Sequence, residues 1–230
     1  MALDQNVTFS TIRIPKGTPH IESLAEQFKD FKLTALQASP EAFAAKFEDE
    51  NLLPTAVWVK RLTTPGHQIF IALATHDAEE DDVTKLLKGS WIGMFTLIGP
   101  VPYDEFIWPE SGAPLPGSDG TETRWQMTAL YTNPDYRGKG IAKKLINTAI
   151  DFGQEYSQTL GPGVKTRFRL FVHPNNTVVL KMYEGMGFVD AGKVTLAEAF
   201  IAVGEADLIP KDPDPAVWHL RAGYGMEHSV

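Results

Sequence analysis

The stretch from Arg124 to Ser157 constrains the fold of this chain most strongly, because it holds a strand, a glycine-bearing turn and a helix in direct succession. Side chains alternate along residues 125–132, with one set being Trp125, Met127, Ala129 and Tyr131 and the other Gln126, Thr128, Leu130 and Thr132. Asn133-Pro134-Asp135 ends this strand, since proline cannot donate to a ladder. After Gly140 the apolar residues follow a helical period: Ile141, Leu145, Ile146, Ala149 and Ile150.

The turn between the strand and the helix is suited to a phosphate ligand. The first N–H groups of a helix lack intrahelical partners, and the helix dipole is positive at that end. Gly138 and Gly140 would let a phosphate approach the backbone closely. Positive side chains surround them, namely Arg137, Lys139, Lys143 and Lys144. We expect a ligand that carries a phosphate or pyrophosphate.

Composition excludes several classes of protein. The chain has 230 residues, 43% of them hydrophobic and 10% aromatic, which is enough for a real core. The net charge of −8 argues against binding of nucleic acid, whose backbone favours basic surfaces. The absence of cysteine excludes disulfides, thiolate metal sites and a cysteine nucleophile. No metal site is expected.

The chain shows no secretory signal and no apolar run of the roughly 20 residues that a membrane span requires. We therefore expect a soluble, cytoplasmic protein with no membrane partner. No repeat or linker divides the sequence, which favours one mixed α/β domain over residues 1–230.

The remaining elements are predicted from periodicity. Strands are expected at Val7–Ile14, Gln68–Ala74, Gly89–Ile98, Arg167–Val172, Val194–Val203 and Ala216–Gly223. Helices are expected at His20–Ala38, from Ser39-Pro40 onward with Ser39 as the N-cap, at Thr55–Thr64 and at Asn176–Met186. The acidic stretch from His76 to Lys88 is expected to be a solvated excursion between two strands without a specific partner.

Residues 99–120 break this compact pattern. They form a long proline-rich loop that contains the aromatic residues Tyr103, Phe106 and Trp108. Such a loop is a candidate to cover an acceptor pocket or to make a homodimer contact. An insertion that is anchored by its own aromatic side chains explains it equally well.

The turn Arg137-Gly138-Lys139-Gly140-Ile141-Ala142 resembles the R/Q-x-x-G-x-G/A signature of the GNAT acyltransferases. Residues 168–188 resemble a second family pattern, with Pro174, Asn176, Tyr183 and Gly187-Phe188 in matching positions. The two motifs occur in the right order and at a compatible separation. The resemblance implies a GNAT-like fold, with a central mixed and mostly antiparallel sheet flanked by helices.

The resemblance also implies acetyl-CoA as co-substrate. The backbone of Leu130, Tyr131 and Thr132 would then bind the pantetheine arm. The pyrophosphate would be held by the N–H groups from Gly138 through Lys139, Gly140 and Ile141 to Ala142. Arg137 and Lys139 are the side chains expected nearest to phosphate, unless they point to water. Asn176 would contact the arm of the cofactor, cap the following helix, or do both.

By the same resemblance, an amine attacks the thioester directly in a ternary complex and Tyr183 protonates the departing thiolate. A phenol has a pKa near 10 and stays protonated at neutral pH. The alternative for Tyr183 is a tyrosine packed in the core.

The general base is not identified by these patterns. Some family members carry a glutamate where this chain has Gln126, which cannot act as a base. Glu122 lies further out on the same strand, and His173 looks like an ordinary turn residue. We expect a base that acts through water.

The acceptor is either a small-molecule amine, which we favour, or a protein amine at an N-terminus or a lysine. The rival hypothesis is a GNAT-like module that binds or senses acyl-CoA without turnover. A nucleotide-dependent enzyme is a distant third, because neither GxxxxGK[ST] nor GxGxxG spacing occurs.

Overall fold

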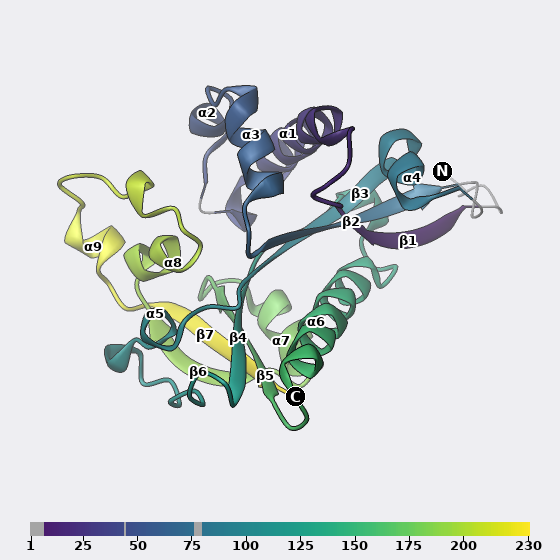
Figure 1. The fold of residues 1–230 in the computed structure, drawn as a ribbon. Helices are drawn as coiled ribbons and strands as arrows, with labels where there is room; N and C mark the ends of the chain where they lie inside the picture. Colours follow the sequence, from purple (N-terminus) through teal and green to yellow (C-terminus); the bar gives the residue numbers. More distant parts are fainter. Residues whose placement is uncertain (1–6, 44, 76–79) are drawn as a thin grey trace. The chain divides into compact units, whose positions relative to one another are not determined.

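The computed structural model describes residues 7–43, 45–75 and 80–230 of the chain. The chain divides into two compact units. Figure 1 labels the helices and strands. The first unit comprises residues 1–96 and 129–149, and the second comprises residues 97–128 and 150–230. Three elements contain residues of both units, namely the end of strand β3 (Ser90–Ile98), strand β4 (Glu122–Thr132) and helix α6 (Ile141–Leu160).

The first unit is built on strands in the order β1-β2-β3-β4. Strand β1 (Thr8–Arg13) pairs antiparallel with β2 (His67–Thr75), from Thr8↔Thr75 to Arg13↔Phe70. Strand β3 (Ser90–Ile98) follows, and the last residues of β4 complete this part of the sheet. These strands agree with the predicted strands at 7–14, 68–74 and 89–98.

Helices α1 (Ile21–Ala38) and α3 (Thr55–Thr63) cover the first unit, with the short α2 (Phe47–Glu50) beside them in Figure 1. The two long helices bury their apolar faces against β2, because Leu24, Phe28 and Trp58 are at most 3% exposed. Phe28 meets Trp58 edge to face at 5.9 Å. Both helices were predicted from their apolar spacing.

The second unit has strands in the order β4-β5-β7-β6. Strand β5 (Lys165–Val172) runs parallel to β4 and antiparallel to β7 (Gly223–Ser229), which in turn pairs antiparallel with β6 (Val189–Val194). The sheet is therefore mixed and mostly antiparallel, as the fold prediction states.

The helices of the second unit are the end of α6, then α7 (Thr177–Glu184), α8 (Leu196–Ala202) and α9 (Pro215–Trp218), with α5 (Tyr103–Phe106) inside the proline-rich loop. Short 3₁₀ turns η2 (Pro109–Ser111) and η4 (Ala206–Leu208) connect them. Figure 1 shows α8 and α9 close to each other, and Phe200 of α8 contacts Trp218 of α9 at 5.1 Å.

Two predicted strands near the C-terminus are wrong. Residues 194–203 contain α8, because Thr195 and Glu198 form a capping box that starts a helix. Residues 216–223 contain most of α9, started by Pro215 after the capping Asp214, and the last strand begins only at Gly223.

One prediction in the first unit also needs correction, and one gains a helix that was not expected. Ser39 makes no cap hydrogen bond, and Pro40 starts only the 3₁₀ turn η1 (Pro40–Ala42). The expected solvated excursion contains helix α4 (Asp82–Lys88), whose N-cap Asp81 accepts from the N–H groups of Val83 and Thr84. Residues 76–79, with part of the acidic run, lie outside the described residues.

Strand β4 departs from simple alternation. Residues 122–127 are all buried, whichever face they occupy, so both faces of this half of the strand are covered. Ala129 then adopts a φ of 54°, the left-handed conformation that residues with a Cβ rarely adopt.

Among the described residues, no helix is long and apolar enough to cross a membrane.

Candidate active site

The ladder between β4 and β5 is shorter than either strand. It runs from Glu122↔Lys165 to Gln126↔Arg169, whereas β4 continues to Thr132 and β5 to Val172. The left-handed Ala129 follows three residues after the last pair and bends β4 away from regular pairing. The backbone of residues 130–132 is therefore free of a ladder with β5.

The side chain of Tyr131 belongs to the core of the first unit. It is 4% exposed and its ring lies 5.8 Å from that of Phe31 and 5.9 Å from that of Phe43. Burial raises the pKa of its phenol. The Tyr131 side chain is therefore occupied in the core, which leaves its backbone for any ligand contact. Thr132, next to it, has a buried hydroxyl without a hydrogen-bond partner in the part of the chain that the structure describes.

The turn before α6 exposes its backbone. Gly138 and Gly140 have φ values of 76° and 77°, and a Cβ at either position would meet nothing within 4 Å. The intrahelical hydrogen bonds of α6 begin with the N–H of Lys144, which donates to the carbonyl of Gly140 at 3.0 Å. The N–H groups of residues 141–143 precede this first bond. This turn has the geometry of an anion site at a helix N-terminus.

The two cations expected nearest to phosphate contact protein groups. Arg137 donates from Nε to the carbonyl of Thr132 at 3.2 Å and from Nη2 to the hydroxyl of Ser39 at 2.8 Å. Lys139 donates to the carbonyl of Asp135 at 3.0 Å and lies over the ring of Tyr136. Arg137 therefore ties the turn to the end of α1, a role that its place in the signature did not reveal.

Contacts with β1 and β3 also hold the turn before α6 and the start of that helix. Lys144 donates to the carbonyl of Phe9, and the ring of Phe9 meets Tyr136 edge to face. A Cβ at Gly93 of β3 would lie 3.0 Å from the carbonyl of Tyr131 and 3.1 Å from Leu145. Sequence reasoning missed Gly93, since an isolated glycine in a strand signals a close approach without naming the neighbour.

Asn176 and Tyr183 lie in the second unit, at the start and near the end of α7. The Asn176 side chain accepts from the N–H of Val179 at 3.3 Å, so it is an N-cap. Tyr183 is 4% exposed, and its ring contacts Phe188 at 5.1 Å. Burial raises the pKa of its phenol well above the ordinary value. The hydroxyl therefore keeps its proton throughout the neutral range.

The three residues weighed as general base are all engaged. Gln126 is 1% exposed, and its Oε1 accepts from Nε of Arg169 at 2.9 Å. Glu122 accepts from Arg167 at 2.6 Å in an ion pair. His173 is exposed, and its Nδ1 accepts from the N–H of Asn175 in a local turn. No residue of this set is an unpaired base.

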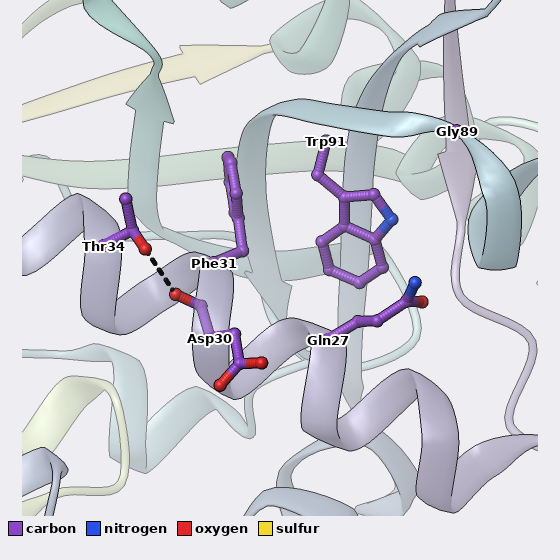
Figure 2. A pocket seen from close by; sticks show the side chains of 6 residues that line it. All are labelled: Gln27, Asp30, Phe31, Thr34, Gly89 and Trp91. Atoms are coloured by element: carbon purple, nitrogen blue, oxygen red, sulfur yellow. Dashed lines mark hydrogen bonds between the residues drawn. The ribbon is translucent and has the colours of Figure 1, made fainter.

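A hollow of about 290 Å³ lies in the first unit between α1 and the start of β3 (Figure 2). Gln27, Asp30, Phe31 and Thr34 come to it from the helix, and Gly89 and Trp91 come from the strand side. The ring of Phe31 meets that of Trp91 at 5.9 Å. None of the predicted site residues lines it.

No group of histidine, aspartate and glutamate in the described residues could hold a metal ion.

The model of the acetyltransferase (GNAT) family matches residues 58–188, which is more than half of the chain, and the chain therefore belongs to this family. It is an acetyltransferase of the GNAT class.

Among curated proteins, the chain is 37% identical over 67 residues to the peptidyl-lysine N-acetyltransferase YjaB of Salmonella typhimurium. That match spans 29% of this chain and 38% of the relative, well under half of the length of either protein.

Solved structures agree with the fold. Arabidopsis thaliana NAA60 in complex with acetyl-CoA superposes with a TM-score of 0.57 at 15% identity, over 97% of this chain and 99% of that chain. A GNAT acetyltransferase from Streptococcus pneumoniae gives a TM-score of 0.55 at 13% identity, over 97% and 100%. At such identities the likeness establishes the fold alone.

Proposed function

We propose that this acetyltransferase moves an acetyl group from acetyl-CoA to a primary amine by direct attack in a ternary complex. The observation that carries the proposal is the turn before α6. It offers the N–H groups of residues 141–143, which precede the first intrahelical hydrogen bond of α6, and two glycines with open space where a Cβ would be. A pyrophosphate fits this donor set, because it supplies acceptor oxygens where the backbone has only donors.

In the proposed complex, the N–H groups of Gly138, Lys139, Gly140, Ile141 and Ala142 bind the pyrophosphate of the cofactor. The backbone at Leu130, Tyr131 and Thr132 binds the pantetheine arm, as an added strand binds an open edge. Arg137 supports this turn from behind, through its bonds to Ser39 and Thr132. Lys139 keeps the positive charge near the phosphates. Asn176 caps α7 and presents its amide to the arm.

Tyr183 is the proposed general acid for the departing thiolate. Its buried phenol stays protonated, which a proton donor requires. The attacking amine must lose a proton, and Gln126 cannot accept it. We propose a water-relayed base for that step.

For the acceptor, the proposal is a primary amine. A small amine was favoured from the sequence, and the peptidyl-lysine activity in the name of the Salmonella relative supports including protein amines. Both classes belong in the first acceptor panel.

One observation favours a second candidate, a module that binds acyl-CoA without turnover. Gln126 occupies the position of a catalytic glutamate and is already bonded to Arg169. A retained Tyr183 argues against this candidate.

A thermal-shift titration with acetyl-CoA, CoA and ATP tests the proposal, followed by thiol release over a panel of amines and peptides. A ligand at a hundred times its Kd adds about 2.7 kcal/mol to the free energy of unfolding. Stabilisation by both CoA species with amine-dependent thiol release supports the enzyme. Stabilisation without release supports the binding module. A larger shift with ATP than with CoA contradicts both.

A further inference from the structure

The proline-rich segment 99–120 is fastened to the sheet of the second unit by two buried arginines. Arg124 of β4 is 2% exposed and holds both ends of the segment. It donates from Nε to the carbonyl of Val101 at 3.1 Å and from Nη1 to that of Gly117 at 2.6 Å, and it pairs with Asp119. The ends of the segment are thus fixed through backbone carbonyls.

Arg169 of β5 holds the middle of the segment. It is 4% exposed, and it donates to the carbonyl of Phe106 as well as to Gln126. Its guanidinium lies 3.7 Å from the ring centre of Phe106, 4.5 Å from that of Trp108 and 5.2 Å from that of Phe171. Trp108 also stacks on Phe171 at 5.3 Å. A cation surrounded by three rings and two acceptors has little freedom to move.

The cluster around Arg169 lies at the end of the β4–β5 ladder. Gln126↔Arg169 is the last pair of the β4–β5 ladder, so Phe106 and Trp108 lie over the point where the ladder stops. Two residues before Arg169 on β5, Arg167 forms ion pairs with both Glu122 and Glu227. Glu227 lies opposite Arg169 on β7. Two arginines and two glutamates balance in charge. These groups of the sheet therefore add no net charge below Trp108, whereas the segment itself exposes Asp104, Glu105 and Glu110.

We infer that Arg169 is a positioning residue that sets acceptor specificity, by holding the half-buried Trp108, backed by the buried Phe106, as a fixed apolar wall at the end of the β4–β5 ladder. The wall favours amines that carry an apolar group beside the nitrogen. This inference rests on the proposed function, in which the cofactor arm binds along the free end of β4. Arg169 itself touches neither substrate.

The test compares the wild type with Arg169→Lys and with the matched control Arg124→Lys, which weakens the anchoring of the same segment at its ends. The readouts are the Kd of acetyl-CoA, and KM and kcat for 2-phenylethylamine and for a Met-Leu dipeptide with a free N-terminus. We expect Arg169→Lys to raise the KM of the better acceptor about tenfold. The Kd of acetyl-CoA and kcat should stay within twofold, and Arg124→Lys should leave all three within twofold.

Equal KM changes in both variants would mean that loosening the segment is the whole effect, and would overturn the inference. So would an unchanged KM in Arg169→Lys. If Arg169→Lys does not fold, Trp108→Leu replaces it, because Trp108 is only half-buried; it should remove any preference for the aromatic amine, and retention of that preference overturns the inference.

If neither probe is acetylated although acetyl-CoA binds, the hydrolysis of acetyl-CoA by water is measured instead. Arg169→Lys should then release thiol from acetyl-CoA several times faster than the wild type, since the wall no longer excludes water, and an unchanged rate overturns the inference. Failure of the proposed function looks different, because then the wild type does not bind acetyl-CoA at all.

Discussion

At the residue scale, Tyr183 offers the sharpest test of chemistry. Replacing it with phenylalanine removes only the hydroxyl from a side chain packed against Phe188, so the fold should persist. We expect kcat to fall on the order of 10²-fold, the usual contribution of a general acid, with the Kd of CoA unchanged. Thiol-release kinetics and a CoA titration measure the two quantities.

The control is Tyr224→Phe, which alters another half-buried tyrosine of the same unit, on β7 beside Lys193. It should leave kcat intact. If Tyr183→Phe also leaves kcat intact, then Tyr183 is a core residue only. Because burial raises the pKa of Tyr183, its ionisation should cause no loss of activity below a pH of about 10.

His67 predicts how stability depends on pH. Burial lowers the pKa of its imidazole, and the charges of Lys16 and Arg61 lower it further. A histidine with a depressed pKa binds protons more weakly in the folded chain than in the unfolded chain. Its contribution to stability is therefore present above a pH of about 6.5, the unfolded value, and is lost as the pH falls below it.

Urea unfolding of the wild type and of His67→Gln at pH 7.5 and 5.0 measures this effect. The wild type should lose more free energy of unfolding on acidification than the variant loses. An equal loss in both proteins would show that other groups carry the acid sensitivity.

At the element scale, the turn before α6 can be tested with one methyl group. In Gly138→Ala the Cβ meets no atom, but the φ of 76° is strained for alanine by about 1–2 kcal/mol. The same holds for Gly163→Ala, which has a φ of 86° and open space in the turn before β5. Both variants should lose similar stability by thermal unfolding.

Only Gly138→Ala should also weaken binding of CoA, by about tenfold or more, because its Cβ occupies the approach of the phosphate. Isothermal titration of both variants separates the two effects. Equal CoA affinities in the two variants would place the pyrophosphate elsewhere.

The elements that sequence predicted well are those whose signals are local. Helix α6, its apolar stripe and the preceding glycine turn follow from neighbouring residues, and the same is true of the Asn176 cap. The helix at 196–202 was missed because Val194, Ile201 and Val203 suggested a strand, although Thr195 and Glu198 already carried the spacing of a capping box.

The parts that sequence could not predict depend on residues far apart. The bond from Arg137 to Ser39 joins positions 98 residues apart, and the one from Arg169 to Phe106 joins positions 63 apart. Arginines that alternate along a strand, as at 167 and 169, do hint at partners on the next strand. The left-handed Ala129 has no such hint, since alanine does not favour that conformation.

At the scale of the whole molecule, the two compact units share β3, β4 and α6. The three boundaries fall inside these elements, between residues 96 and 97, between residues 128 and 129, and between residues 149 and 150. A unit that unfolds alone would have to break an element in the middle. We therefore predict one cooperative unfolding transition, as expected for a single domain over residues 1–230.

Thermal unfolding followed by far-UV circular dichroism and by tryptophan fluorescence measures this. The tryptophans report on both units, because Trp58 and Trp91 lie in the first and Trp108, Trp125 and Trp218 lie in the second. Coincident midpoints support one domain, and two separated midpoints would contradict it.

The arginine anchors of segment 99–120 carry a consequence for how such a protein can diversify. Arg124 and Arg169 bind the carbonyls of Val101, Gly117 and Phe106, and every amino acid supplies a carbonyl. Substitutions in the segment can therefore accumulate without loss of these attachment points. The sheet supplies the anchoring side chains, so the sequence of the segment can change while its attachment to the sheet is kept. Substitutions within these roughly twenty residues can therefore change the acceptor preference while the cofactor-binding turn and Tyr183 stay the same.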